Sequence, residues 1–554
     1  MKWYFPRQLP GQVETEVTQR DQFSNDDVEL SETIIREALQ NSLDAAIDDR
    51  AEVKVSIRLV SVDDGLNPDF VESLVREQRI HAEAANLDLE SVDKNYPTAL
   101  VIEDFGTKGL TGSVNSRDED NFSDFWRRHG KSHKTGKSRG RWGLGKLVYS
   151  STSMIGAFFG VTIREGDQQP LLMGQTVLNL RKLDGIEYPP HGFFADLEGE
   201  GDPYREIAVP IKDQSLVSDF FQQFSLKRDK ETGLSVIIPF PNPKFSIDAL
   251  IGTAIANYFY PILTGQLTLS FDDLLIDEGS VRSLAHQYAS DKLSDIDLLF
   301  DFIEGSCSLE DVSIYELKPS WSKNGRLSEE DFEPEDLKNA RELYIDGKMI
   351  GLKLPLNLTR KDGTRIDTFF SVFIQQPESL SKGVDLYVRG GLTLPGEAKF
   401  RDRKALGAMI AEDEEICSFL GYAENAAHTQ WIGSAEKLKQ HYKAASKVVR
   451  SIKHALVEFY DLLSDNAEQV DENALRSFFW IEQPEADKSS NKKTKPKATP
   501  INIPPPPEPR PKDFAIRSVD GGFIVSTTSN ADPVRFPQEV TVKVAGNPPI
   551  FSRC

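Results

Sequence analysis

Three features are scarce in this chain of 554 residues: cysteine, long apolar runs and positive charge. Its three cysteines, Cys307, Cys417 and Cys554, are far apart and odd in number, so they predict neither a disulfide framework nor a zinc site. No run of about 18 apolar residues is present, which argues against a membrane-spanning helix, and the N-terminus lacks the apolar core of a secretion signal. We therefore expect a cytoplasmic protein.

The deficit of positive charge limits the partners. Lys and Arg number 65 against 87 Asp and Glu, a formal net charge of -22. Such a charge opposes non-specific binding to nucleic acid by the chain as a whole, although local basic patches can still bind it. Apolar residues make up 39% of the chain, enough for several cores.

The pattern along the chain predicts an α+β protein of four parts. Residues 1–247 alternate helix and strand, and residues 248–480 contain strands near 343–352, 367–374 and 384–389 before a long amphipathic helix at 433–464. Residues 481–512 are a Lys/Pro-rich linker, which composition alone makes extended. Residues 513–554 form a small β-rich segment.

Within the first part, hydrophobic periodicity places the individual elements. We expect helices at 31–50, with Ser31 as N-cap, and at 66–92 and 145–154. Strands are expected at 53–60, 99–102, 156–163, 170–180 and 234–239. The polar, glycine-rich stretch 106–141 is expected to be a long loop.

The first helix carries a polar motif, EALQNSLDA, at residues 37–45. Glu37, Asn41 and Asp44 are spaced i, i+4 and i+7, so they share one face. A carboxylate can activate water, and an amide oxygen can bind Mg²⁺. A solvated helix face explains the same residues equally well.

Two further segments suit the recognition of a flat base. Asp104-Phe105-Gly106-Thr107-Lys108-Gly109 follows a buried strand, where a carboxylate can accept from an exocyclic amine and glycines allow close approach. Thr232-Gly233-Leu234-Ser235 leads into another strand and offers hydroxyl groups. Taken singly, the first is typical of a turn and the second of an ordinary buried strand.

A third glycine-rich segment, GRWGLGK at residues 140–146, precedes a helix. Free backbone N–H groups and the helix dipole there favour phosphate. The spacing approaches that of a P-loop, GxxxxGK[ST], but Leu147 stands where the metal-binding hydroxyl is required.

In order, E-x-x-x-N-x-x-D-A, D-x-G-x-x-G, G-x-x-G-x-G and T-G-x-S resemble the motifs of GHKL ATPases, over about residues 1–250. The family shares the Bergerat α/β sandwich and includes gyrase B, MutL, MORC proteins, histidine kinases and a heat-shock chaperone. In style the chain is closest to the MutL, MORC and chaperone branch. One departure is that Gly109 lies three residues after Gly106, where the family usually has two.

The resemblance implies ATP and Mg²⁺ as cofactors and assigns roles. Glu37 would be the general base, Asn41 the Mg²⁺ ligand, and Asp104 the acceptor of the adenine amine. The remaining nucleotide contacts would come from Asp44, Gly106, Gly109, Gly140, Gly143, Leu144, Gly145, Lys146 and Thr232.

The same resemblance makes residues 248–480 a transducer-like α/β domain that sends a cation to the γ-phosphate. Lys399 is the residue we expect in this role, and the loop at Arg389-Gly390-Gly391 is the other candidate. Some cations of the basic segment 127–141 would neutralise the triphosphate beneath a lid.

These roles predict an ATPase that closes its lid, forms a homodimer and acts as a conformational switch for protein partners, as in anti-phage defence systems. A DNA-repair or chromosome-associated ATPase and a chaperone-like ATPase are the alternatives. No histidine precedes Glu37, which argues against a histidine kinase. No DQHAxxE-type motif indicates a nuclease, and the retained Glu37 argues against a non-hydrolysing module.

Overall fold

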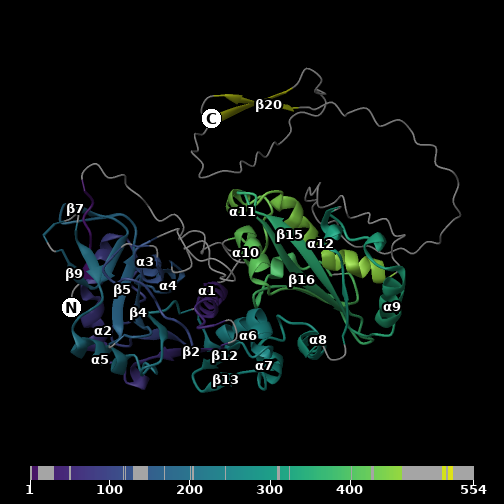
Figure 1. The fold of residues 1–554 in the computed structure, drawn as a ribbon. Helices are drawn as coiled ribbons and strands as arrows, with labels where there is room; N and C mark the ends of the chain where they lie inside the picture. Colours follow the sequence, from purple (N-terminus) through teal and green to yellow (C-terminus); the bar gives the residue numbers. More distant parts are fainter. Residues whose placement is uncertain are drawn as a thin grey trace. The chain divides into compact units, whose positions relative to one another are not determined.

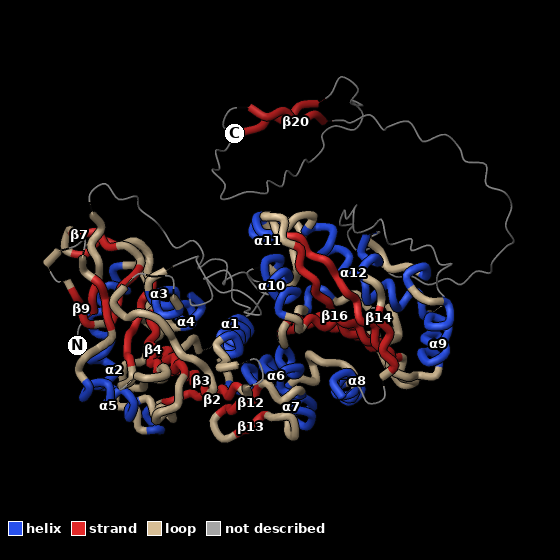
Figure 2. Tube along the Cα trace, in the orientation of Figure 1, coloured by secondary structure: helices blue, strands red, loops and turns tan. Residues whose placement is uncertain are grey.

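A computed structural model describes residues 3–9, 30–48, 51–116, 118, 120–128, 147–167, 169–199, 201–202, 205–243, 245–308, 312–323, 325–400, 402–425, 429–464, 514–519 and 522–527. All structural statements below concern these residues. The chain divides into two compact units, Met1–Val470 and Asp471–Cys554. The larger unit contains two mixed sheets with helices packed on them (Figures 1 and 2).

The first sheet has nine strands, and only the pairing of β2 with β12 is parallel. From edge to edge they are β1 (Trp3–Tyr4), β8 (His191–Phe194), β5 (Leu171–Val177), β4 (Ala157–Ile163), β11 (Gly233–Pro239), β3 (Ala99–Phe105), β2 (Val53–Val60), β12 (Leu267–Phe271) and β13 (Leu274–Ile276). Two small hairpin-like pairs accompany it: β6 (Arg181–Leu183) with β7 (Ile186–Tyr188), and β9 (Asp196–Glu198) with β10 (Ile207–Val209).

Side chains of the central strands alternate between two cores. In β3, Leu100 and Ile102 join one apolar cluster, whereas Val101 joins the other. This period of two buries both faces of the sheet. Helices α2 (Pro68–Ala84) and α5 (Gln214–Gln223) cover one face, and α1 (Leu30–Asp44), α3 (Asn121–Trp126), α4 (Leu147–Thr152) and α6 (Ile247–Leu263) cover the other (Figure 1).

The α+β class and most elements of the first part are confirmed, with four corrections. The helix predicted at 31–50 ends at Asp44, and Ser31 lies inside it instead of capping it. The helix predicted at 66–92 spans only Pro68–Ala84. Strand β3 continues to Phe105, so Asp104 lies within the strand. The stretch 106–141 is not only loop, because Asp120 caps α3 by accepting from the N–H of Ser123.

The second sheet has six strands and follows the first sheet in the chain. Their order is β14 (Ser313–Glu316), β15 (Ile350–Thr359), β16 (Arg365–Gln375), β19 (Leu406–Ala411), β17 (Val384–Arg389) and β18 (Leu392–Thr393). Helices α9 (Pro334–Ile345) and α12 (Ala445–Leu463) share a core with this sheet. The other helices are α7 (Val281–Tyr288), α8 (Ile296–Ser308), α10 (Glu414–Ala423) and α11 (Glu436–His441), and short 3₁₀ turns lie at Val62–Asp64, Pro319–Lys323, Glu329–Asp331 and Pro395–Glu397.

Two predictions for the second part are wrong in detail. The strand expected at 343–352 begins only at Ile350, because residues 343–345 still belong to α9. The helix expected at 433–464 is two helices, α11 and α12. They are separated where Ala444 adopts a left-handed conformation, with φ 52°. A non-glycine residue with positive φ cannot continue a helix.

The first sheet extends past residue 247, since β12 and β13 belong to it. Helix α6 then contacts β18 of the second sheet. One apolar cluster accordingly runs from α1 through α6 to side chains of β17, β18 and β19.

In the smaller unit the structure describes one antiparallel pair, β20 (Phe514–Val519) with β21 (Gly522–Thr527). This agrees with the β-rich segment predicted there. Among the described residues of the whole chain, none of the helices combines the length and apolar character needed to cross a membrane.

Candidate nucleotide site

Helix α1 presents the polar motif beside a buried stripe. Ile34, Ile35, Ala38, Leu39 and Leu43 are buried, as the periodicity predicted. Glu37 is only 7% exposed, whereas Asn41 and Asp44 are half-buried. A carboxylate this buried is not part of a solvated helix face, which removes the main alternative interpretation of Glu37.

Tyr149 of α4, which was not among the residues predicted from the sequence, interacts with the polar motif of α1. Tyr149 is buried, and its hydroxyl shares a hydrogen bond with the side chain of Asn41. Burial raises the pKa of Tyr149, the bond to Asn41 lowers it, and the negative charges of Glu37 and Asp104 raise it further. The phenol of Tyr149 is therefore bonded to Asn41 and lies within the electrostatic influence of Glu37 and Asp104.

Asp104 is held at the end of β3 by three donors. The Ser42 hydroxyl donates to its Oδ2 at 3.2 Å, while the Thr107 hydroxyl and the Leu234 N–H donate to its Oδ1 at 2.5 and 2.8 Å. Burial raises the pKa of Asp104, although Arg228 and these donors oppose the shift. Oδ2 accepts only one of these three bonds, so it keeps capacity for a further donor such as an exocyclic amine.

Beneath Asp104 lies a network of buried charges. Glu103 accepts from Arg58 at 2.6 Å and from the Ser235 hydroxyl at 3.0 Å. Arg228 donates to the carbonyl of Asp104 at 2.5 Å and to Ser235 at 3.1 Å. Ser235 was expected to contact the base, but its hydroxyl is bonded to Glu103 and Arg228. Thr232 lies just before β11.

The glycines beside Asp104 are required by the chain itself. Gly106 and Gly109 have φ of 74° and 64°, in the left-handed region. A Cβ on Gly109 would lie 2.6 Å from the Thr162 hydroxyl and 2.7 Å from the Ile163 carbonyl. Thr162 in turn accepts from the N–H of Leu110 and donates to the Gly233 carbonyl. This close packing accounts for both glycines without invoking a ligand.

The predicted phosphate loop lies outside the described residues. This applies to Gly140, Gly143, Leu144, Gly145 and Lys146, and to the basic residues between 129 and 141. At the near end of this segment, Arg127 donates to the carbonyls of Ser116 at 2.7 Å and Ala208 at 2.9 Å. Arg128 lies 3.5 Å from Asp124. Both cations are therefore used locally.

Lys399 also has partners of its own. Its ammonium donates to the backbone carbonyl of Glu397 at 2.7 Å and lies 4.6 Å from the centre of the Tyr387 ring. Burial lowers its pKa, while the charge of Glu397 raises it. The structure thus brings Lys399 to Glu397, and its role at the nucleotide remains a prediction.

Another cation of the second part lies nearer to α1. Arg389, at the end of β17, is fully buried and forms a two-pronged ion pair with Glu424. Burial lowers its pKa, but Glu424 and, more weakly, Asp44 of α1 raise it overall. The loop at Arg389 was the other candidate in the sequence, and its role at the nucleotide also remains a prediction.

Arg36, next to Glu37, joins α1 to helix α6 and to strand β18 of the second sheet. It donates to the Asn257 amide at 2.5 Å and to the carbonyl of Thr393 at 3.4 Å. The Tyr258 hydroxyl donates to the carbonyl of Arg36 at 2.6 Å. A movement of β18 would therefore displace Arg36, which is the residue next to Glu37.

The residues present suit Mg²⁺ bound together with a triphosphate. A half-buried amide such as Asn41 is one oxygen ligand, and Mg²⁺ commonly takes the rest from phosphate and water. Within the described part of the chain, no group of three or more His, Cys, Asp or Glu side chains is placed to hold a metal alone. A metal held jointly with a nucleotide is compatible with both observations.

No protein-family model matches this chain, and no curated protein does. Among solved structures, it is similar to the ATPase region of Saccharomyces cerevisiae topoisomerase II bound to dexrazoxane. That match has 8% identity over 77% of this chain and 84% of that one, with a TM-score of 0.31. A second match is the ATPase and transducer domains of DNA topoisomerase II from Balamuthia mandrillaris, with 9% identity, coverage of 78% and 84%, and a TM-score of 0.31. At these scores the similarity is loose, and the function has to be argued from the side chains.

Proposed function

We propose that the chain binds ATP with Mg²⁺ and hydrolyses it at the site between α1, β3 and α4. The observation that carries the proposal is the bond from Ser42, beside Asn41 on α1, to the buried carboxylate of Asp104 on β3, with Tyr149 hydrogen-bonded to Asn41 and exposed to the charges of Glu37 and Asp104. Residues from two segments about sixty positions apart meet there with the chemistry that the motifs predicted. A set of unrelated turns and solvated faces would not bring them together.

In this proposal each group has a distinct task. Asp104 accepts a hydrogen bond from the exocyclic amine of adenine through Oδ2, and Ser42 and Thr107 hold the carboxylate in place. Asn41 would hold Mg²⁺ through its amide oxygen, and the bound metal would screen the phosphate charge. Glu37 takes a proton from the attacking water as it adds to the γ-phosphorus, and ADP leaves as the β–γ bond breaks.

We further propose that the second part of the chain senses the nucleotide. Arg36 donates to the carbonyl of Thr393 in β18, which links α1 to the second sheet, and the charge of Asp44 on α1 acts weakly on Arg389 of β17. Nucleotide-dependent movement of the helix would then be transmitted. ATP-dependent homodimerisation, a cytoplasmic location and an output through partner proteins, as in anti-phage defence, complete this conformational switch.

The deciding experiment compares two variants of α1. Glu37→Gln should retain ATP binding by calorimetry but hydrolyse ATP about 10²–10⁴-fold more slowly, the usual scale for loss of a general base. Glu32→Gln makes the same charge change in the first turn of the same helix and should retain full activity. Equal turnover in both variants would remove Glu37 from its role, and a wild-type chain that binds no ATP would refute the proposal.

The dimer is tested separately by light scattering. The mass of the Glu37→Gln protein should double with ATP and stay that of a monomer without it. A constant monomer mass would leave the ATPase proposal intact and remove the homodimer from it.

A further inference from the structure

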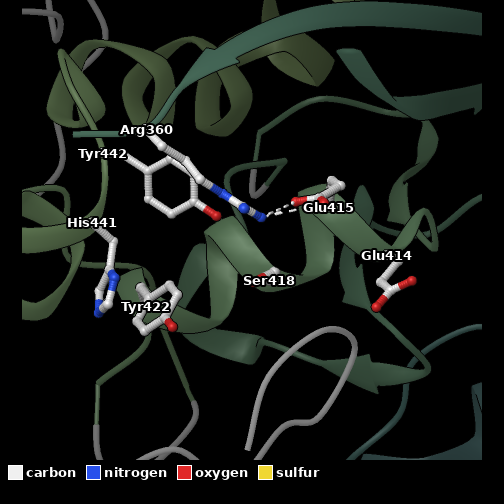
Figure 3. A pocket seen from close by; sticks show the side chains of 7 residues that line it. All are labelled: Arg360, Glu414, Glu415, Ser418, Tyr422, His441 and Tyr442. Atoms are coloured by element: carbon white, nitrogen blue, oxygen red, sulfur yellow. Dashed lines mark hydrogen bonds and ion pairs between the residues drawn. The ribbon is translucent and has the colours of Figure 1, made fainter. Parts of the chain in front are cut away.

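A second pocket lies on the other part of the large unit, away from the residues that define the nucleotide site. It encloses about 350 Å³ and is formed by α10, the end of α11 and the turn between β15 and β16 (Figure 3). Its lining residues are Arg360, Glu414, Glu415, Ser418, Tyr422, His441 and Tyr442. None of them belongs to a motif that the proposed ATPase uses.

The walls of this pocket are fixed by the backbone. The N–H of Lys361 donates to the carbonyl of His441, and the N–H of Lys443 donates to the carbonyl of Thr359, both at 2.8 Å. The rings of Tyr422 and His441 are stacked, with centroids 4.2 Å apart. The pocket is therefore a built cavity, since its two sides are joined by hydrogen bonds and ring packing.

The lining favours a cation. It contains two carboxylates against one guanidinium, and Arg360 pairs with Glu415 at 3.1 Å. Glu414 is exposed at the rim, and no ion pair is recorded for it within the described part of the chain. Two tyrosine rings, Tyr422 and Tyr442, add faces that attract positive charge. An anion would meet the two carboxylates, while Arg360 is already paired with Glu415 and the ring of His441 is stacked on Tyr422.

The Arg360–Glu415 pair shows that the cavity accommodates a planar guanidinium. In Figure 3, the Arg360 guanidinium lies between the Tyr442 ring and Glu415, and Ser418 faces the same space from α10. An incoming cation would find the unpaired carboxylate of Glu414 next to this arrangement. Guanidinium and carboxylate groups bind well because their hydrogen bonds are charge-assisted.

Helix α10 connects this pocket to the nucleotide helix. It carries Glu414 and Glu415 in its first turn, and Glu424 follows its last residue. The buried carboxylate of Glu424 pairs with Arg389, which lies in the field of Asp44. Because α10 is one continuous helix from Glu414 to Ala423, a shift of its first turn on ligand binding would be carried to Glu424 at its other end.

We propose that this pocket binds an alkylguanidinium or alkylammonium cation, and that its occupancy alters ATP affinity through α10. The cation could be the side chain of an arginine or lysine in a partner polypeptide or a free small molecule, since both present the same group. The pocket would thereby give the switch a second input. The coupling rests on the proposed function, whereas the binding does not.

Binding is tested by calorimetry on the full chain without nucleotide. The probes are the peptide acetyl-GSRSG-amide, its glutamine counterpart acetyl-GSQSG-amide, and arginine amide. The arginine peptide should bind, and Glu414→Gln should weaken it by about tenfold, the loss expected for one charge-assisted hydrogen bond. Glu335→Gln, the matched change in the first turn of α9, should bind as the wild type does.

The outcomes separate the claims. Equal binding of arginine amide and the arginine peptide indicates a free cation as ligand, and binding of the peptide alone indicates a polypeptide. If the glutamine peptide binds as well as the arginine peptide, or if Glu414→Gln changes nothing, the cation site is refuted. If the cation binds but leaves ATP affinity unchanged, the coupling through α10 is refuted. A chain that binds the cation but never ATP refutes the proposed function and leaves the pocket assignment standing.

Discussion

The hydroxyl of Ser42 donates to the Oδ2 atom of Asp104 at 3.2 Å, joining helix α1 to the end of strand β3. Both side chains are buried. Because Ser42 follows Asn41 directly, this bond fixes the distance between the residue proposed to read adenine and the one proposed to hold Mg²⁺. A nucleotide that contacts both must span this fixed separation.

Asp104 should show a trade-off between function and stability. Burial raises its pKa, so the folded protein binds a proton at Asp104 more readily than the unfolded chain does. Its ionised form is therefore a cost to folding at neutral pH, and that cost disappears as the pH falls below the unfolded value. Asp104→Asn should unfold at the same temperature as the wild type or higher, yet bind ATP about 10–100-fold more weakly.

Calorimetry and thermal unfolding at neutral pH check this pair of effects. Glu458→Gln is the control, because Glu458 is also a carboxylate whose pKa burial raises, but it lies on α12 and accepts from the N–H of Leu327. The control should leave ATP affinity unchanged. Unaltered affinity in Asp104→Asn would mean that Asp104 does not read the base.

Tyr149 should act through magnesium. Its hydroxyl shares a hydrogen bond with Asn41 and fixes the orientation of that amide. Tyr149→Phe keeps the ring that packs against Phe158, 5.5 Å between centroids, and removes only the hydroxyl. Loss of such a supporting contact typically weakens metal binding by about tenfold. The Mg²⁺ concentration for half-maximal ATPase activity should rise accordingly, while the melting temperature changes little. A fall in activity that excess Mg²⁺ does not restore would contradict this positioning role.

The sequence predicted what depends on local pattern. The apolar stripe of α1 and the bounds of β2 and β17 follow from hydrophobic periods of 3.6 and 2 residues. These periods can be read from the residue order alone. The candidate site was located for the same reason, since Glu37 and Asn41 are set by helical spacing. The motif order then led to Asp104 on a different element.

What the sequence missed depends on tertiary contacts. Tyr149 was overlooked because its role comes from facing Asn41 across two helices, although a hydroxyl just after the glycine-rich segment was a usable signal. The pairing of Lys399 with Glu397 could not be deduced because it is formed by a loop conformation. The break at Ala444 was hidden because alanine normally favours helix, so nothing in the residue type indicates its positive φ.

The stability of the protein should fall at acid pH because of His81 on α2. Burial, and then the charge of Arg181, lower its pKa to about 4. Its Nδ1 accepts from Arg181 Nε at 3.0 Å, and its ring stacks on Phe5 with centroids 3.6 Å apart. The neutral ring thus stabilises the fold above pH about 6.5, its unfolded value, and this contribution is lost as the pH falls toward 4. His81→Gln keeps an acceptor for Arg181 and cannot titrate. Its stability relative to the wild type should rise between pH 6.5 and 4 in urea unfolding, and parallel curves would contradict the assignment.

Loss of one partner of the Arg389–Glu424 ion pair should destabilise the protein much more than replacement of both partners by apolar residues. Both side chains are fully buried, so removing one partner leaves an uncompensated charge, at a cost of about 3–5 kcal/mol. Glu424→Gln should therefore lower the stability of the large unit strongly in urea unfolding.

Replacing both residues, Arg389→Met with Glu424→Leu, should recover most of the loss, because apolar side chains of similar volume fill the space without desolvation of charge. If the double variant is as unstable as the sum of the single ones, the residues stabilise the fold through other contacts. If it recovers stability but ATP affinity no longer responds to the arginine peptide, the pair is the element through which α10 acts on the nucleotide site.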